Sequence, residues 1–407
     1  MSSQPRSVID FSLPTANAAF VDGGENDLKP FCPLSWSSQN ILAFPRGNRI
    51  YLKNIASTVE DVGYTFKPSK KHGILRMLDF CHDVPNLLAL GTSNDNIELW
   101  DIETKKMTRS WTATGITCLE WNEGRVLAVG DKKGSIQYYD TRIDDRKEMK
   151  MRKGKVTRHE APITTISWNR KDPKYLASGD KDGVIYYWDS RQDAPLKMGE
   201  MVQRRRKMQH DHAVSVCAYP PVFRVTDEPP KTMGWCNSRV LATASNEPDN
   251  TSVLRVWTMD DYSENIERHE YDATIVGIHT SWCKEIVLTH GLGRIISHPS
   301  NLATPIPSEI ENSVVVYALP YFKQAKQVKY VGSGWRNLGS VLDRPGTKMV
   351  VAVGGIDGGT AAGQLQVCDV WGKKTAPAPE PSPVHGGLVR RQNSLSSLSR
   401  RGSLIIR

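Results

Sequence analysis

The chain has 407 residues, of which 39% are hydrophobic and 24% are charged. This composition is typical of a globular chain that can bury a core, and it excludes a disordered or collagen-like chain. The formal net charge is +9, but residues 372–407 carry seven Lys or Arg and one Glu, so +6 of it lies there and the first 371 residues carry only +3. The sequence therefore indicates a nearly neutral body followed by a basic tail.

Neither membrane insertion nor secretion is indicated by the sequence. No apolar run approaches the ~18 residues that a membrane span needs, and the first twenty residues lack a cationic segment followed by an apolar one. The seven cysteines are scattered, without a CxxC pair. This spacing favours reduced thiols in nucleus and cytoplasm over a disulfide scaffold or a zinc cluster. We expect no metal and no cofactor.

A repeated pattern organises residues 34–371. Each copy has a short apolar run that ends in small residues, a polar turn, and an alternating strand that closes on an anchor residue, usually aromatic. Clear copies read LLALGTSNDNIELWD (87–101), RVLAVGDKKGSIQYYD (125–140) and YLASGDKDGVIYYWD (175–189). We count seven copies, and their anchor residues are Tyr51, Trp100, Tyr139, Trp188, Trp257, Tyr317 and Cys368.

Each copy is expected to form two strands joined by a tight turn. Alternation directs every second side chain into an interface between sheets, and Gly, Asp and Asn supply the positive φ angles of tight hairpins. The anchors are 39 to 69 residues apart, and the shorter spacings are near the ~40–45 of a WD-type propeller blade. The sequence predicts an all-β fold, a seven-bladed WD-repeat β-propeller over 31–372, between an N-terminal segment (1–30) and a disordered basic tail (373–407).

The fourth copy contains a Ser, His and Asp set that allows two interpretations. His159, Ser178, Asp182 and Trp188 have the types and order of the buried hydrogen-bond tetrad of WD repeats, in which the histidine bridges the turn aspartate to the serine. The alternative is a hydrolase triad, but the sequence has no GxSxG elbow. We therefore predict a structural tetrad. The other copies lack parts of this set, so we expect the stability of their blades to depend more on apolar packing.

Other motifs that carry chemistry are absent. The sequence contains no GxGxxG, GxxxxGK[ST], HExxH or paired CxxC motif, so we expect that the protein is not an enzyme. The glycines of VAVGGIDGG (351–359) could hold a phosphate, but no helix pattern follows them, and a blade hairpin is the better interpretation. The run 204–207, RRRK, could contact phosphate, although such a run is more often a solvated loop. We expect neither a membrane nor a nucleic acid as partner.

Strings in several copies resemble one family of WD-repeat proteins. PLSWSSQNILA in the first copy, LLALGTSNDNIELWD in the second and ITCLEWNEGRVLAVGDKKGSIQYYDTR (116–142) in the third are similar to the fizzy and fizzy-related family, the co-activators of the anaphase-promoting complex. KEIVLTHGLGR (284–294) is similar to the family's sixth blade, and the terminal Ile406 and Arg407 match its Ile-Arg tail.

This resemblance implies a substrate-recognition role in ubiquitin-dependent protein degradation during the cell cycle. In the family the propeller binds substrate degrons and the tail docks on a tetratricopeptide-repeat subunit of the ubiquitin ligase. The co-activator does no chemistry, because it acts by holding the substrate near the ligase. The resemblance implies that Ile406 and Arg407 are the docking residues.

The resemblance also implies a degron site. In the family, the Arg-x-x-Leu degron called the D-box lies in a groove between the first and last blades. FVDGGENDLKPF (20–31) resembles the segment that lines this groove, with Val21 as apolar wall and Asp22 and Glu25 as partners of the degron arginine. A solvated acidic linker is the alternative interpretation.

Two family features are not matched. SQPRSVID near the start does not match the family's C-box, which is expected of either a truncated sequence or a divergent member. The loops that read the second degron type, the KEN box, here correspond to DKDG (180–183), NEPDNTS (246–252) and an insertion at 292–312, without the usual polar residues. The sequence therefore gives no support for KEN-box recognition.

The tail offers sites for regulation. Ser394 and Ser403 follow arginine pairs, and Ser382 precedes a proline, so phosphorylation would add negative charge beside the docking terminus. Two other functions stay open: a generic WD-repeat scaffold, and an RNA-associated propeller that uses the Arg204 loop and the basic tail. A steep loss of RNA affinity with salt would favour the second of these.

Overall fold

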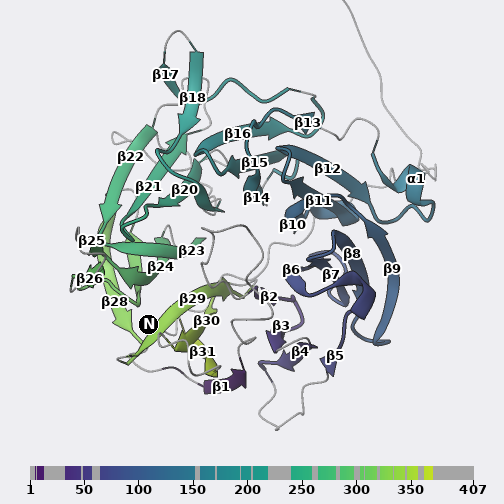
Figure 1. The fold of residues 1–407 in the computed structure, drawn as a ribbon, viewed down its shortest axis with the longest axis horizontal. Coiled ribbons are helices and arrows are strands. Elements are labelled where there is room, and N and C mark those ends of the chain that lie inside the picture. Colours follow the sequence, from purple (N-terminus) through teal and green to yellow (C-terminus); the bar gives the residue numbers. More distant parts are fainter. Residues whose placement is uncertain are drawn as a thin grey trace, which may run out of the picture. The chain divides into compact units, whose positions relative to one another are not determined.

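Seven β-sheets form a ring in the computed structural model (Figure 1). The residues that the structure describes are 5, 7–12, 33–46, 49–56, 65–151, 156–169, 172–192, 194–202, 205–218, 240–258, 265–280, 285–297, 303–306, 308–318, 321–332, 334–343, 346–355 and 362–369. The predicted all-β, seven-bladed propeller is confirmed. We number the blades in chain order.

The first three blades are four-stranded antiparallel sheets. Blade one contains β2 (Ser35–Trp36), β3 (Ile41–Arg46), β4 (Arg49–Asn54) and β5 (Thr65–Phe66). Blade two follows the short helix η1 (Lys70–His72) and contains β6 (Leu75–Phe80), β7 (Leu87–Thr92), β8 (Asn96–Asp101) and β9 (Lys106–Thr112). Blade three contains β10 (Ile116–Trp121), the turn η2 (Glu123–Arg125), β11 (Val126–Asp131), β12 (Ser135–Asp140), the helix α1 (Arg146–Met149) and β13 (Val156–Thr157).

The next three blades carry the insertions. Blade four contains β14 (Ile163–Trp168), β15 (Tyr175–Asp180), β16 (Val184–Asp189), β17 (Glu200–Val202) and β18 (Arg205–Gln209). Blade five contains β19 (Val214–Ala218), β20 (Val240–Asn246), β21 (Ser252–Thr258) and β22 (Asn265–Tyr271). Blade six contains β23 (Ala273–Thr280), β24 (Glu285–Gly293), β27 (Ser313–Ala318) and β28 (Lys323–Lys329), with the inserted hairpin of β25 (Ile295–Ser297) and β26 (Ala303–Pro305).

The last blade joins the two ends of the propeller. It contains β29 (Trp335–Leu342), β30 (Lys348–Gly355), β31 (Ala362–Asp369) and, as its outer strand, β1 (Ser7–Ser12), which pairs antiparallel with β31. The sequence placed residues 1–30 outside the propeller, and that boundary is wrong for Ser7–Ser12. An outer strand from the N-terminus satisfies the exposed edge of β31 and closes the ring.

The ring is built from contacts between neighbouring first strands. Among the described strands, β2, β6, β10, β14, β19, β23 and β29 each contact the next one in this order, and β29 contacts β2. Seven clusters of buried apolar side chains lie one at each interface between neighbouring blades. Every sheet thus buries both faces against its neighbours, as the two-residue alternation predicted.

The seven sequence copies correspond to the second and third strands of the seven blades. In each hairpin the anchor residue lies opposite an apolar residue of the second strand, as Trp188 lies opposite Leu176 and Cys368 opposite Met349. The turn glycines have positive φ, for example +84° at Gly183. A Cβ there would lie 2.1 Å from the carbonyl oxygen of His210, so the turn requires glycine.

Polar side chains on the first strands link neighbouring blades. In blades one to three, the residue just before the aromatic residue that ends the first strand accepts a hydrogen bond from the next blade. The donor is the backbone N–H of the aromatic residue that ends the first strand of that next blade. Ser35 Oγ accepts from Phe80 N at 3.0 Å, Asp79 Oδ2 from Trp121 N at 3.1 Å, and Glu120 Oε2 from Trp168 N at 3.0 Å. These bonds fix the register between blades one to four, because each strand end is held by the strand before it.

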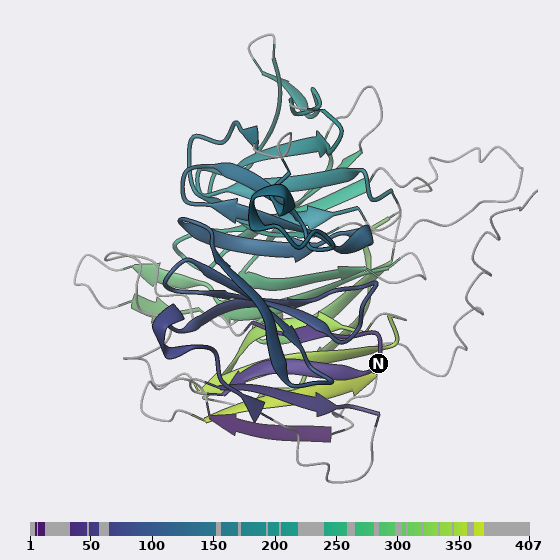
Figure 2. The same ribbon diagram turned by 90° about the vertical axis from the view of Figure 1, so that its right-hand side faces the viewer.

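Two hairpins extend from the ring. The hairpin β17–β18 is attached to β16 of blade four, and it stands out at the upper end of Figures 1 and 2. The hairpin β25–β26 projects from blade six, on the left in Figure 2. Among the described residues, no helix has the length and apolar character that a membrane span requires.

Candidate functional site

The predicted tetrad of blade four is a chain of buried hydrogen bonds, with one change of residue. The indole Nε1 of Trp188 donates to Ser178 Oγ at 2.8 Å, Ser178 Oγ lies 2.7 Å from His159 Nε2, and His159 Nδ1 lies 2.7 Å from Asp180 Oδ2. The fourth member is therefore Asp180. The prediction of Asp182 is wrong, because residues 178 and 180 lie on the same face of β15 whereas residue 182 is exposed in the turn.

Asp180 also builds the turn that follows it. Its Oδ1 accepts the backbone N–H of Asp182 at 3.0 Å and that of Val184 at 2.8 Å. One carboxylate therefore holds both the histidine and the hairpin. Because Ser178 is 0% exposed and is bonded on two sides, this Ser, His and Asp set is structural and cannot meet a substrate as a hydrolase triad would.

Blade five contains a second tetrad that the sequence analysis missed. Trp257 Nε1 donates to Thr243 Oγ1 at 2.9 Å, Thr243 Oγ1 lies 2.8 Å from His210 Nε2, and His210 Nδ1 lies 3.0 Å from Ser245 Oγ. The serine occupies the place of the aspartate. In blade two, the single side chain of Glu98 connects the histidine to the tryptophan. Its Oε1 lies 2.5 Å from His72 Nδ1, and its Oε2 accepts from Trp100 Nε1 at 2.7 Å.

These three blades share a sequence signal that could have identified the networks. Trp100, Trp188 and Trp257 are the three tryptophan anchors, and each has a histidine shortly before the first strand of its blade. A buried indole N–H needs an acceptor, so a tryptophan anchor that follows such a histidine predicts a polar partner between them.

Burial of His210 makes part of the stability depend on pH. The side chain has no carboxylate in its tetrad, and burial, with the positive charges of Arg255 and Arg268, lowers the pKa of His210 to about 3. Unfolded histidine titrates near pH 6.5, so below that pH the unfolded chain binds a proton that native His210 does not. Stability therefore falls as pH decreases from 6.5 towards 3 and is unaffected above 6.5.

We expect the free energy of unfolding to decrease by about 2 kcal/mol between pH 7 and pH 5 on account of His210. The His210→Gln variant, which cannot titrate, should be less stable at pH 7 but should lose less between the two pH values. Urea denaturation at both pH values measures the difference. Equal losses in the two proteins would contradict the assignment.

The residues predicted to bind degron or ligase all lie outside the described residues. These are Val21, Asp22 and Glu25, the terminal Ile406 and Arg407, and the serines Ser382, Ser394 and Ser403. The described strands on either side of segment 20–31 are informative, because β1 belongs to the last blade and β2 to the first.

The seam between the last and first blades is apolar. Trp36, Phe44, Leu338 and other buried residues form its core. Half-buried apolar residues pack against this core, namely Ile9, Leu34, Tyr51, Ile55 and Val341. The guanidinium of Arg46 lies over the Tyr51 ring at 5.0 Å from its centroid. This seam offers an apolar surface of the kind that a leucine side chain could contact.

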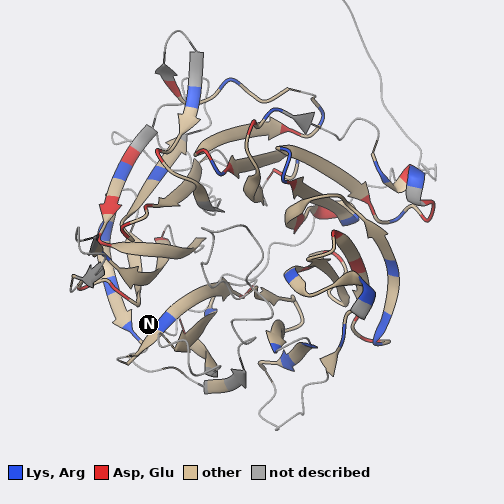
Figure 3. Ribbon diagram, in the orientation of Figure 1, with Lys and Arg blue, Asp and Glu red and all other residues tan. Residues whose placement is uncertain are grey.

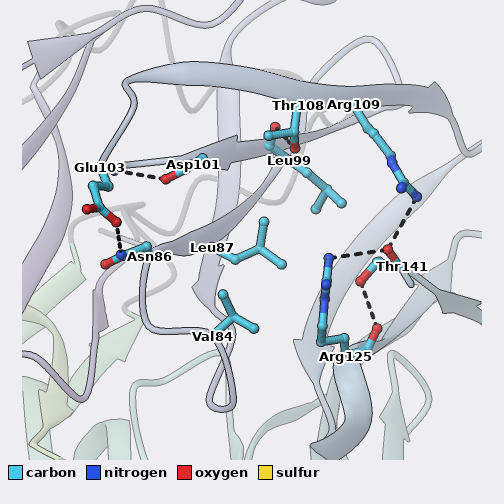
Figure 4. A pocket seen from close by; sticks show the side chains of 10 residues that line it. All are labelled: Val84, Asn86, Leu87, Leu99, Asp101, Glu103, Thr108, Arg109, Arg125 and Thr141. Carbon is cyan, nitrogen blue, oxygen red and sulfur yellow. Dashed lines mark hydrogen bonds between the residues drawn. The ribbon is translucent and has the colours of Figure 1, made fainter. Parts of the chain in front are cut away.

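A pocket of about 310 Å³ lies between blades two and three (Figure 4). Its lining residues are Val84, Asn86, Leu87, Leu99, Asp101, Glu103, Thr108, Arg109, Arg125 and Thr141. Apolar side chains form the middle, with Asn86 and Glu103 bonded to each other on one side and the two arginines on the other (Figure 4). The size and lining suit a side chain of a bound peptide.

The loops assigned to the KEN box are used internally. Asn246 holds blade six to blade five, because its Oδ1 accepts Ile275 N at 2.8 Å and its Nδ2 donates to Ile275 O at 3.0 Å. The insertion after Gly293 forms the hairpin β25–β26, and Arg294 pairs with Asp249 at 3.2 Å. The polar side chains of Asn246, Asp249 and Arg294 are thus engaged in contacts within the protein.

Comparison with known proteins shows distant and partial similarity. No protein-family model matches the chain. It is 32% identical over 114 residues to "Anaphase-promoting complex subunit cdc20" of Dictyostelium discoideum (28% of this chain, 22% of that protein). It is 29% identical over 141 residues to "WD repeat-containing protein srw1" of Schizosaccharomyces pombe (34% and 24%), and 30% identical over 113 residues to "APC/C activator protein CDC20" of Saccharomyces cerevisiae (27% and 18%).

The matched part thus spans less than a quarter of the length of each of these relatives. Among solved structures, a chain of the "Crystal Structure of Mitotic Checkpoint Complex" superposes with a TM-score of 0.66 at 20% identity, over 91% of this chain and 96% of that one. At this identity the superposition shows the fold. The protein is therefore a seven-bladed β-propeller with distant, partial similarity to Cdc20 and Fizzy-related WD-repeat proteins.

Proposed function

We propose that the protein is a substrate-recognition co-activator of the anaphase-promoting complex, acting in nucleus and cytoplasm. The observation that carries the proposal is its local sequence similarity to proteins named as a subunit and an activator of that complex. A seven-bladed ring with buried polar networks is a rigid platform. Its role in the proposal is to bind a degron and to hold the substrate beside the ligase.

The degron site in this proposal is the seam between the last and first blades. Asp22 and Glu25 hold the arginine of the D-box and Val21 contacts its leucine. Three observations support this: the match of residues 20–31 to the family segment, the flanking strands in the last and first blades, and the half-buried apolar residues of the seam.

The double change Asp22→Ala and Glu25→Ala should weaken binding of a D-box peptide by at least roughly tenfold, because a charge-assisted hydrogen bond contributes about 1.5–3 kcal/mol. Isothermal titration calorimetry of the full chain measures the affinity. The matched control is Glu123→Ala with Glu160→Ala, two exposed carboxylates away from this seam, which should leave the affinity unchanged. Unchanged affinity in the Asp22 and Glu25 variant would remove these residues from the site.

The second contact in the proposal is the C-terminal Ile406 and Arg407. An isoleucine fills an apolar pocket, and an arginine pairs with a carboxylate through two parallel hydrogen bonds. Removing both residues, or adding one residue after Arg407, should reduce association with the ligase and leave the free energy of unfolding unchanged. Co-purification of both variants at the wild-type level would show that the terminus is not the anchor.

Affinity purification tests the function as a whole. The tagged full chain, expressed in dividing cells, should retain subunits of the anaphase-promoting complex, identified by mass spectrometry. The buried variant Asp180→Ala, which we expect to unfold more easily, controls for non-specific capture of destabilised protein. Absence of ligase subunits from the wild-type sample would favour a generic WD-repeat scaffold instead.

A further inference from the structure

The pocket between blades two and three has sides of opposite charge. Asp101 and Glu103 line one side. Arg109 and Arg125 line the other, and apolar side chains form the middle (Figure 4). Residues of both signs also occur along the strands of these two blades (Figure 3). A pocket of this kind is complementary to a ligand in which an apolar body separates a positive group from a negative one.

Contacts within blade two hold the acidic side in place. Asn86 Nδ2 donates to Glu103 Oε2 at 2.7 Å, and Asp101 Oδ1 accepts the backbone N–H of Glu103 at 3.0 Å. Among the described residues, Glu103 forms no ion pair at 4.0 Å or less. Its negative charge is therefore available to a cationic group of a ligand.

The two arginines of the basic side differ in their contacts. Arg109 Nη1 donates to the carbonyl oxygens of Ile143 at 2.6 Å and of Thr141 at 3.3 Å. Its Nη2 forms an ion pair with Asp144, so Arg109 mainly holds blade three to blade two. Arg125 Nη2 donates to Thr141 O at 3.4 Å, but its buried Nε has no hydrogen-bond partner among the described residues. Arg125 thus retains a donor for a ligand.

Arg125 also has a strained backbone conformation. Its φ is +60°, in the left-handed region that residues with a side chain rarely adopt. Thr141 N and Oγ1 donate to the carbonyl oxygen of Arg125 at 3.1 and 2.9 Å, and Gly124 N donates to Asp83 Oδ2 of blade two. Strain of this kind persists where surrounding contacts hold it, and it clusters at ligand sites. Here it coincides with the residue that brings an unpartnered donor to the pocket.

We propose that this pocket binds a short apolar peptide with free termini, in the simplest case a dipeptide. The C-terminal carboxylate accepts from Arg125, the N-terminal ammonium donates to Glu103, and the side chains contact the apolar middle. A sphere of 310 Å³ is about 8 Å across, and two extended residues span about 7 Å. The termini of a dipeptide therefore reach both charged sides, whereas a free amino acid is too short.

Isothermal titration calorimetry of the wild-type full chain with alanyl-leucine tests the class of ligand. Acetylation of the N-terminus, amidation of the C-terminus, or both, remove the charges of this dipeptide one at a time or together. Each singly capped form should bind at least about tenfold more weakly than the free dipeptide, because it loses a charge-assisted hydrogen bond. Free leucine should bind at least about tenfold more weakly as well, because it reaches one charged side only.

Two variants assign the charged ends of the peptide. Arg125→Gln should bind the free and the amidated dipeptide within about twofold of each other, and Glu103→Gln should do so for the free and the acetylated dipeptide. The controls are Glu123→Gln and Lys133→Gln, exposed residues of blade three outside the pocket, and both should keep the wild-type preferences.

Binding of the doubly capped dipeptide as tightly as the free one would overturn the proposal, because the pocket would then accept an internal segment of a protein chain. No detectable binding at about 10 mM dipeptide would overturn it as well, since a ligand of this size in a matching pocket binds in the millimolar range or better. Wild-type preferences in Arg125→Gln and Glu103→Gln would contradict the assigned contacts. The peptide series uses the wild type, so it decides the question even where a variant is unstable.

Discussion

The Trp188→Ala variant is expected to lose about 3–5 kcal/mol of unfolding free energy, as other large aromatic truncations in cores do. Trp188 is 1% exposed and packs in the cluster between blades three and four, with Tyr186 edge-on at 5.5 Å between ring centroids. The change leaves a cavity and also removes the donor to Ser178 Oγ. Urea denaturation monitored by far-UV circular dichroism measures the loss.

A Trp188→Phe variant separates the two contributions. Phenylalanine keeps most of the apolar volume but cannot donate, so the loss should be smaller, about 1–3 kcal/mol for the hydrogen bond and its buried acceptor. A loss below about 1 kcal/mol in Trp188→Ala would show that this anchor does not hold the interface between the blades.

The second large effect distinguishes two aspartates that are two residues apart. Asp180→Ala should cost about 3 kcal/mol or more, because it leaves His159 without its buried partner and removes the acceptor of two turn N–H groups. Asp182→Ala is the matched control at an exposed position and should change stability by less than about 0.5 kcal/mol. Thermal unfolding of the two variants side by side measures both values.

Similar losses in both variants would contradict the hydrogen-bond chain that the structure shows. A larger loss in Asp182→Ala than in Asp180→Ala would restore the assignment made from the sequence. The two changes remove the same carboxylate atoms from the same hairpin, so a difference in stability between the variants reports the contacts of Asp180.

The ring could be predicted from the sequence because its signal is local and repeated. Every hairpin of second and third strands has its own alternation, turn and anchor, and none depends on distant residues. The outer strand β1 could not be found this way. Its partner β31 is some 350 residues away, and a strand of six residues at the N-terminus has no turn or anchor to mark it.

The buried networks were predicted in part, and the errors have physical causes. Order and residue type pointed to an aspartate in DKDG, but they do not say which one faces the histidine. Strand alternation from Ser178 selects Asp180. Apolar packing was expected of the other blades, but blades two and five have networks in which Glu98 and Ser245 take the place of the aspartate of blade four. The signal that leads to them is the tryptophan anchor of each blade, whose indole N–H donates to the network.

The proposed degron and ligase contacts depend on side chains that no local pattern positions. Asp22 and Glu25 were assigned by resemblance, and their partners would come from another molecule. The pocket between blades two and three was not predicted, because its lining comes from five separate stretches of blades two and three. Surfaces of this kind arise from the arrangement of blades, which the sequence pattern of one blade does not encode.

Ubiquitin transfer in a reconstituted reaction tests the proposed function most directly. Purified anaphase-promoting complex, ubiquitin-activating and ubiquitin-conjugating enzymes and a D-box substrate are combined with or without the full chain. The proposal predicts that adding the chain increases ubiquitin conjugation to this substrate, and that mutation of the D-box Arg and Leu, or removal of Ile406 and Arg407, abolishes the increase. Conjugation that is the same with and without the chain would contradict the proposal.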